Sequence, residues 1–254
     1  MSVTRKATIE VKLLPLRQAL QAVQPHRSKV KTGDDEAMYR VRLVFSAGWL
    51  FVMATNGSTS ALAKAGLFTD SRGALGKLDP DDGPIVVDLT PAQVPLILAK
   101  FKPNQAESAA QQLIVFTIDL DPADPFIKLT DTGGLWSNGW AEEYPIDPPA
   151  EAFPDVIRIA GDALQRSAES NQPKDLVTDP KLLALFKAAG TAYDAPVRIR
   201  ATGTPDSRGF IVTCGSDFVG TIESKHGDDG GTKNRDAALL DWLNLIRPAN
   251  LKAV

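Results

Sequence analysis

Two stretches of this chain share one order of elements, and that internal repeat limits the fold more than any other feature. The first runs from Val87 to Trp136 and the second from Val177 to Glu223, at an offset of about 88 residues. In each, a short apolar run leads into a helix that starts at a proline, and three strand-like segments follow. The spacing i, i+3, i+4, i+7 predicts the same buried face for both helices: Val94, Ile97, Leu98 and Phe101 in the first, and Leu182, Leu185, Phe186 and Ala189 in the second.

A second, shorter similarity precedes each copy. Residues 7–23 align with residues 155–169 at an offset of about 144 residues, with Ala19–Gln21 matched by Ala163–Gln165. Together the two similarities predict one full β-α-β unit and a second copy that has lost about 55 residues.

Composition limits the class of protein. The chain has 254 residues, of which 43% are apolar, and this predicts a soluble globular protein with a substantial core. It has no run of about 18 apolar residues and no apolar signal core near Met1, so we expect a cytoplasmic protein without a membrane partner. A net charge of -3 excludes a uniformly basic nucleic-acid-binding protein, so any DNA contact requires basic residues gathered on one face.

The residue types that carry chemistry are sparse. Cys214 is the single cysteine, so the sequence predicts no internal disulfide and no Cys/His zinc site. Asp119, Asp121 and Asp124 lack the spacing of a calcium loop, and we interpret them as a solvated turn. The two histidines lie in polar segments without a Ser or Cys motif beside them. We therefore expect no enzyme, no catalytic residues, no metal and no cofactor.

Alternation and turn residues predict the remaining elements. The predicted strands are 8–13, 39–45, 49–54, 60–68 and 85–88. The first helix has an apolar stripe formed by Leu13, Leu16, Leu20 and Val23. In the second helix Thr90 is the predicted N-cap, with Pro91 at the first helical position.

Changes in composition divide the chain into four parts. Residues 1–140 form the first unit, and the proline-rich, acidic residues 141–153 form a linker. Residues 154–226 form the second, abridged unit, and 227–254 contain a glycine-rich hinge and an amphipathic C-terminal helix.

Basic residues recur on or beside the predicted helices. Taken singly, they are typical of solvated helix faces, but their shared placement in the repeat indicates a common role. This set, completed by Gln21 and by Lys29 of a basic loop, is Arg17, Gln21, Lys29, Lys100, Lys102, Arg166, Lys181 and Lys187.

Two parts of the sequence resemble the DNA sliding clamps, especially the last domain of the bacterial DNA polymerase III beta clamp. One consists of DPKLLALFKAAG, PVRIRATG and GFIVTCGSDFVGTIE, and the other is the hairpin segment YRVRLVFSAGWLFVMATNGSTSALAKAGL. The resemblance covers most of residues 7–224. It implies an α+β DNA clamp fold, in which two β-α-β clamp units, the second abridged, place helices on one face of antiparallel sheets.

The resemblance also implies a function. A sliding clamp is a ring of six such units whose helices line a channel around duplex DNA, and it tethers a replicative DNA polymerase after a clamp loader has placed it. The resemblance therefore implies that the basic residues named above, with Gln21, are candidate DNA-binding residues that hold phosphates without sequence specificity. Two units in one chain imply a homo-oligomer, with a homotrimer expected, and the reduced size is typical of a phage clamp. The alternative is a clamp-derived interaction protein that binds a replication or transcription partner without encircling DNA.

Two features depart from the family pattern. Bacterial clamps end in a Met-Pro-Met-like segment that lines the pocket for polymerase peptides, and Thr221–Ser224 stands in its place here. The predicted C-terminal helix carries the apolar residues Leu240, Trp242, Leu243 and Ile246. These residues are candidates for partner or assembly contacts, because so short a helix has to dock to be stable. Either it covers apolar surface of its own unit, or it reaches a neighbouring subunit or partner.

Overall fold

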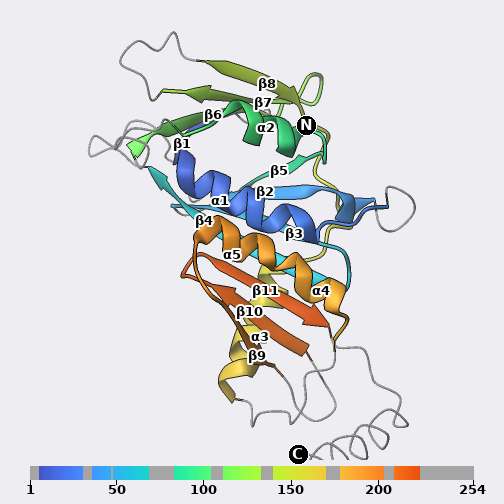
Figure 1. The fold of residues 1–254 in the computed structure, drawn as a ribbon. Coiled ribbons are helices and arrows are strands. Elements are labelled where there is room, and N and C mark those ends of the chain that lie inside the picture. Colours follow the sequence, from blue (N-terminus) through green and yellow to red (C-terminus); the bar gives the residue numbers. More distant parts are fainter. Residues whose placement is uncertain are drawn as a thin grey trace, which may run out of the picture.

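The computed structural model describes residues 6–30, 36–46, 48–68, 83–103, 111–132, 140–169, 178–202 and 209–223. Its architecture is α+β, with antiparallel strands and helices packed against them (Figure 1). The strands are β1 Lys6–Lys12, β2 Val41–Ser46, β3 Trp49–Thr55, β4 Thr59–Phe68, β5 Ile85–Leu89, β6 Leu113–Asp119, β7 Phe126–Asp131, β8 Ala141–Pro145, β9 Val197–Ala201, β10 Gly209–Cys214 and β11 Phe218–Glu223. The helices are α1 Leu13–Val23, α2 Gln93–Lys100, α3 Val156–Glu169, α4 Pro180–Leu185 and α5 Lys187–Tyr193, with short 3-10 turns η1 Gln24–His26 and η3 Ala37–Tyr39.

Strand β4 joins the two units. The order of the first unit is β5-β2-β3-β4-β1-β6-β7-β8, and β4 also pairs with β11 of the second unit, where the order continues through β10 to β9. Thr59–Ala63 of β4 pair with β11, whereas Leu67 and Phe68 pair with β1. One strand therefore belongs to both units, and the sheet runs through it without a break.

The main repeat predicted from the sequence is present in the fold. Helix α2 is followed by the antiparallel strands β6, β7 and β8, and the pair α4 and α5 is followed by β9, β10 and β11. The second unit is abridged. In the first unit β1 pairs with the outer edge of β6, whereas no described strand pairs with the equivalent edge of β9.

The shorter similarity predicted from residues 7–23 and 155–169 is wrong as a structural equivalence. Helix α1 packs beside α5, while α3 lies on the opposite face of the sheet (Figure 1). Successive residues of one strand show this, since Leu43 belongs to the core under α1 and Val44 to the cluster that packs on Val156 of α3. The aligned residues also differ in burial, because Leu20 is 1% exposed and Leu164 is 45% exposed. The aligned residues therefore belong to helices on opposite faces of the sheet.

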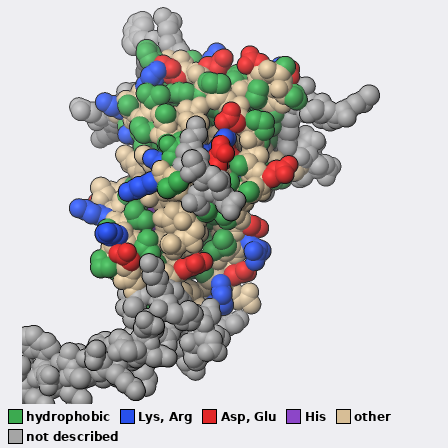
Figure 2. Space-filling view, turned by 90° about the vertical axis from the view of Figure 1, so that its right-hand side faces the viewer, with side chains coloured by type: hydrophobic (Ala, Val, Ile, Leu, Met, Phe, Trp, Pro, Cys, Tyr) green, Lys and Arg blue, Asp and Glu red, His purple; other side chains and the backbone are tan. Residues whose placement is uncertain are grey.

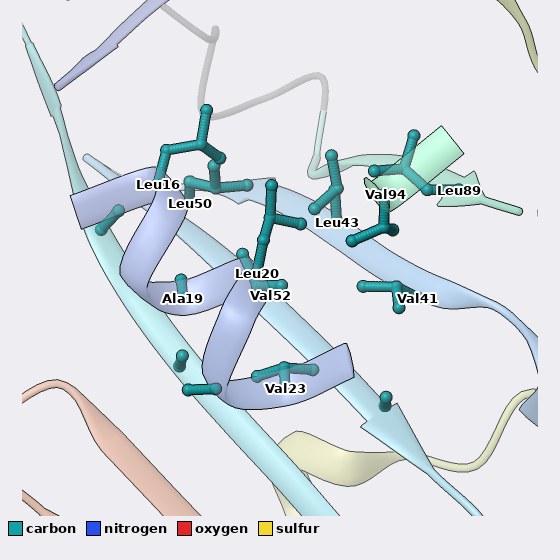
Figure 3. Packing of buried hydrophobic residues seen from close by; sticks show 14 of the residues in the cluster. Leu16, Ala19, Leu20, Val23, Val41, Leu43, Leu50, Val52, Leu89 and Val94 are labelled. Carbon is teal, nitrogen blue, oxygen red and sulfur yellow. The ribbon is translucent and has the colours of Figure 1, made fainter. Parts of the chain in front are cut away.

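The core under α1 follows the predicted apolar stripe. Leu13, Leu16, Leu20 and Val23 are all buried, as expected. Figure 3 shows Leu16, Ala19, Leu20 and Val23 of α1 above Val41, Leu43, Leu50 and Val52 of β2 and β3. Full burial of such a side chain contributes about 1.5–3 kcal/mol to folding, so this layer is the main support of the first unit.

Two element boundaries differ from the sequence expectation. The regular part of helix α2 begins at Gln93, two residues after the predicted first helical position, Pro91. Thr90 and Gln93 nevertheless form the reciprocal cap that is expected of an N-cap at Thr90. The Thr90 N–H donates to Gln93 Oε1 at 2.7 Å, and the Gln93 N–H donates to Thr90 Oγ1 at 3.4 Å. The segment expected as a linker from residue 141 begins with strand β8, which pairs with β7.

Candidate nucleic-acid interface and partner site

Four helices cover one face of the continuous sheet. We call this the helix face, formed by α1, α2, α4 and α5, and we call the opposite side, which carries α3, the outer face (Figure 1). The start of α4 follows from its sequence, because Asp179 is the N-cap, its Oδ1 accepts the Lys181 N–H at 2.8 Å, and Pro180 takes the first helical position. The described residues include no helix long and apolar enough to cross a membrane.

Arg17, a predicted DNA contact, joins two helices. Its guanidinium donates to the carbonyl oxygens of Leu98 and Phe101 at the end of α2. Partial burial lowers the pKa of Arg17 from its ordinary value, because the charged form is desolvated. The side chain thus satisfies helix carbonyls that α2 leaves open at its C-terminus.

Lys100 is also held within the protein. Its ammonium lies 2.6 Å from a carboxylate oxygen of Glu142 on β8. Lys102, two residues beyond the end of α2, is exposed. Of the predicted pair, Lys102 is therefore the one that projects freely to solvent.

Gln21 and Lys187 meet at one hollow on the helix face. The hollow has a volume of about 480 Å³ and lies between α1 and the helices α4 and α5, where Pro25, Ala188 and Thr191 also line it. Lys181 is exposed at the start of α4. The second unit therefore places two predicted lysines on this face. In Figure 2, Lys and Arg side chains gather along the left-hand edge, which is the helix face seen from the side.

The other predicted basic residues are placed differently. Arg166 lies on α3 and so on the outer face, where its Nε donates to the Asp162 carbonyl oxygen at 3.1 Å. Lys29 is exposed just after the short turn η1. The predicted set is therefore divided between the two faces, and Arg166 stands apart from the helix-face residues.

A second hollow lies on the outer face, where the two units meet. We call it the outer hollow; it has a volume of about 660 Å³. Its lining includes Arg158 and Ile159 of α3, Ser58 of the turn between β3 and β4, Phe210 of β10, and Ile222 and Glu223 of β11. The half-buried Ile159 thus lies beside charged and hydroxyl groups, and such a mixed lining can bind a peptide.

The turn that borders the outer hollow is held rigidly. Asn56 Oδ1 accepts the N–H groups of Ser58 and Thr59 at 3.0 and 2.8 Å, and Gly57 supplies a φ of 83°. The Thr55 hydroxyl donates to the Thr59 carbonyl oxygen at 2.9 Å. One wall of the hollow is therefore preorganised.

A buried ion pair positions the other wall. Arg42 Nε and Nη2 donate to the two carboxylate oxygens of Asp88 at 2.7 and 2.9 Å, and Asp88 is fully buried. The same pair binds the connector before α3, since Arg42 Nη2 donates to the Ala150 carbonyl oxygen at 2.6 Å and the Ala150 N–H donates to Asp88 at 2.8 Å. The guanidinium also lies 4.2 Å from the ring centroid of Phe153. These contacts fix where α3 begins.

Sequence reasoning missed this anchor and the outer hollow as a whole. It did single out Thr221–Ser224 as the segment that stands where related clamps line their peptide pocket, and Thr221, Ile222 and Glu223 do line the outer hollow. Ser224 and the candidate partner residues Leu240, Trp242, Leu243 and Ile246 lie outside the described residues. Within the described ranges, no group of three or more His, Cys, Asp or Glu residues could hold a metal ion.

Comparison with solved structures identifies the fold. The DNA polymerase sliding clamp of Bacillus subtilis superposes with a TM-score of 0.54 at 12% identity, over 90% of this chain and 67% of that one. The DNA polymerase III beta subunit of Thermotoga maritima gives 0.54 at 10% identity, over 88% and 65%. A putative DNA polymerase III beta subunit of Eubacterium rectale gives 0.55 at 9% identity, over 89% and 67%.

These likenesses establish the DNA clamp fold for this chain, as the sequence resemblance implied. The chain spans about two thirds of the length of the clamps that it matches. No protein-family model and no curated protein sequence matches it.

Proposed function

We propose that this protein is a DNA sliding clamp, a processivity factor that forms a ring around duplex DNA and tethers a replicative DNA polymerase. One observation carries the proposal: a sheet continuous through β4 bears α1, α2, α4 and α5 on a single face. Repetition of such a wall around a channel presents helices to the duplex and strands to solvent. The protein acts in the cytoplasm without cofactor or catalysis, after a clamp loader has placed it on DNA.

The DNA contacts in this proposal come from the exposed part of the helix face. Lys102, Lys181 and Lys187 supply positive charge to phosphates, and Gln21 supplies a neutral hydrogen-bonding group. Few phosphate contacts give weak binding without sequence preference, which suits a protein that slides. Retention on closed circular DNA then depends on closure of the ring as well as on these phosphate contacts.

The outer hollow is the proposed site for partner peptides, including those of the polymerase and the loader. Ile159, which is half-buried, provides apolar surface for an anchoring side chain, and Arg158 provides a charged rim. The site lies on the outer face, so a bound partner does not obstruct the channel. Two units in one chain make a homotrimer the expected ring, which gives three such sites.

The test compares retention on closed circular and linear duplex DNA. A variant with Lys102→Glu, Lys181→Glu and Lys187→Glu is expected to leave closed circles about tenfold faster or more, because three phosphate contacts become repulsive. The matched control carries Lys64→Glu, Lys128→Glu and Arg166→Glu, an equal change of charge on the outer face. Retention that is equal on circles and on linear DNA for the parent protein refutes the clamp proposal.

A second candidate function has one observation in its favour. No described strand covers the free edge of β9, so the second unit is smaller than the first. A clamp-derived protein that binds a partner without encircling DNA does not need a complete second unit. This candidate predicts partner binding at the outer hollow by a protein that remains monomeric and is not retained on circular DNA.

A further inference from the structure

We propose that residues 237–247 of this chain dock as a helix on an apolar stripe of α3 in the same chain. We call the stripe, formed by Ile157, Gly161 and Leu164, the α3 stripe. We call residues 237–247, which the sequence predicts to be an amphipathic helix and which lie outside the described residues, the C-terminal helix. The inference concerns the arrangement of one chain and does not depend on the clamp proposal.

The α3 stripe is a second apolar face on a helix that already has a buried one. The buried residues of α3 are Val156, Ala160 and Ala163. Ile157 and Leu164 lie at i and i+7 on another face, where they are 42% and 45% exposed. Single exposed apolar residues are common, but two at helical spacing form a face that a second helix can cover. Of the described helices, α3 alone exposes two large apolar side chains.

The C-terminal helix carries an apolar stripe of the same length. Its members, at i, i+3, i+4 and i+7, are Leu239, Trp242, Leu243 and Ile246. Ile157 and Leu164 also span two turns, so each stripe is about 10 Å long. Between them a Cβ atom at Gly161 would meet no atom within 4 Å. The middle of the α3 stripe is therefore open to a large side chain such as Trp242.

The C-terminal helix needs such a surface. Asp236 is a typical N-cap and Pro248 ends the helix, so the sequence predicts about three turns. A helix of that length is marginal in water, and burial of its apolar face supplies most of its stability.

The chain leaves the described sheet beside α3. Glu223 of β11, the last described residue, lines the outer hollow together with Arg158 and Arg166 of α3. Residues 224–236 then join β11 to the C-terminal helix, and a glycine-rich linker of this length spans about 20 Å on average. Helix α3, with 14 residues, is about 21 Å long. The linker therefore reaches the α3 stripe without being fully extended.

The short linker favours α3 of the same chain over α3 of a neighbour. A linker whose length matches its span gives an effective concentration in the millimolar range. At micromolar protein concentration, a neighbouring copy offers the same stripe at about a thousandfold lower concentration. Docking within one chain is therefore the arrangement that the linker selects.

The α3 stripe is separate from the outer hollow. The α3 residues that line the hollow are Arg158, Ile159, Asp162, Ala163 and Arg166. Ile157, Gly161 and Leu164 lie on another side of the helix. A helix docked on the stripe consequently leaves the hollow open.

Hydrogen exchange in the full chain, followed by mass spectrometry, tests the contact. The amides of residues 237–247 are expected to exchange about tenfold faster or more after Ile157→Gln with Leu164→Gln, because the C-terminal helix then loses its docking surface. The matched control is Leu14→Gln with Leu96→Gln, since these leucines are 37% and 47% exposed on α1 and α2. The control is expected to leave this exchange unchanged.

A change in the C-terminal helix gives a reciprocal readout. Trp242→Gln with Ile246→Gln leaves α3 and the sheet unaltered, and it is expected to accelerate exchange in residues 237–247 to the same extent. Thermal melting, together with slow exchange in the β2–β3 hairpin, verifies that both variants remain folded.

Protein concentration and mixing identify which chain provides the α3 stripe. Docking within one chain gives exchange that is the same at about 1 and about 100 µM protein, and mixing the two defective variants restores nothing. Slow exchange that requires high concentration, or that returns on mixing, would assign the stripe to a neighbouring copy and overturn the proposal.

Two further outcomes would overturn it. Slow exchange in residues 237–247 of both the parent and the Ile157→Gln, Leu164→Gln chain would mean that the C-terminal helix docks elsewhere. Fast exchange in the parent would mean that it does not dock, and that the α3 stripe is open to a different protein. Retention of the parent on circular DNA tests the clamp proposal separately from all of these.

Discussion

Phe186 lies against Gly220 where the two units meet. A Cβ atom at Gly220 would collide with the Phe186 ring and would lie 2.9 Å from the Ser60 carbonyl oxygen of β4. On its other side Phe186 contacts His26 of the first unit, with 4.4 Å between ring centroids. The Phe186 ring thus fills a space that exists only because residue 220 has no side chain.

Gly220→Ala is therefore expected to lower the free energy of unfolding by about 1–3 kcal/mol through overpacking. Gly161→Ala is the control, since a Cβ there meets no atom within 4 Å and Gly161 lies inside helix α3. That substitution is expected to stabilise by about 0.5–1 kcal/mol. Urea denaturation measures both, and equal stability of Gly220→Ala and the parent would contradict the packing described.

Acid is expected to weaken the same junction through His26. Burial lowers the pKa of His26 from 6.5 to about 3, because the charged imidazole would be desolvated. The folded protein therefore keeps His26 neutral, while the unfolded chain takes up a proton below its ordinary pKa.

His26 consequently makes its full contribution to stability above about pH 6.5. That contribution falls by up to about 1.4 kcal/mol for each pH unit as the pH drops toward 3. Denaturation at several pH values, for the parent and for His26→Phe, measures the difference between the two. As the pH falls below 6.5, the parent should lose stability relative to His26→Phe. A difference in unfolding free energy that is constant with pH would refute the lowered pKa of His26.

The Arg42–Asp88 pair is expected to be sensitive to loss of either partner. Asp88→Ala leaves a partly buried guanidinium without its carboxylate and should cost about 3–5 kcal/mol. The double variant Arg42→Met, Asp88→Leu should recover part of this, since no unpaired charge remains. The exposed pair Arg158 and Asp162, 3.3 Å apart, is the control and should contribute little. Chemical denaturation measures the free energy of unfolding of each variant. A small loss for Asp88→Ala would show that the Arg42–Asp88 pair does not anchor the connector before α3.

The sequence-based hypothesis assigns Arg17 to DNA contact, whereas in the structure it binds the end of α2, and a substitution distinguishes the two roles. Because its guanidinium bonds the end of α2, Arg17→Lys should lower stability by about 1.5–3 kcal/mol while keeping the positive charge. Retention on circular DNA should stay near that of the parent. Unchanged melting together with lost retention would instead assign Arg17 to the phosphates.

Sequence reasoning succeeded where local pattern and tertiary environment agree. Alternation located the hairpin β2–β3, and Gly48, with a φ of 86°, closes it as expected. The stripe on α1 gave its buried face because every apolar residue of that stripe meets the sheet.

It failed where the deciding partner is distant and carries no signature of its own. The groups that bind Arg17 are backbone carbonyls 81 and 84 residues away, and any residue type provides those. Asp88 lies 46 residues from Arg42, so the ion pair could not be read from spacing. Likewise the apolar periodicity of α3 did not indicate which face of the sheet it would cover.

The double membership of β4 has a consequence for the order of folding. Phe218 pairs with Ala63, about 155 residues earlier in the chain, so this pairing closes one of the longest loops in the protein. The first unit already has its other strand partners once β8 has been synthesised, whereas β11 emerges from the ribosome near the end of translation. Until then the Thr59–Ala63 edge of β4 has no partner, and during that interval it can pair with a strand of another nascent chain.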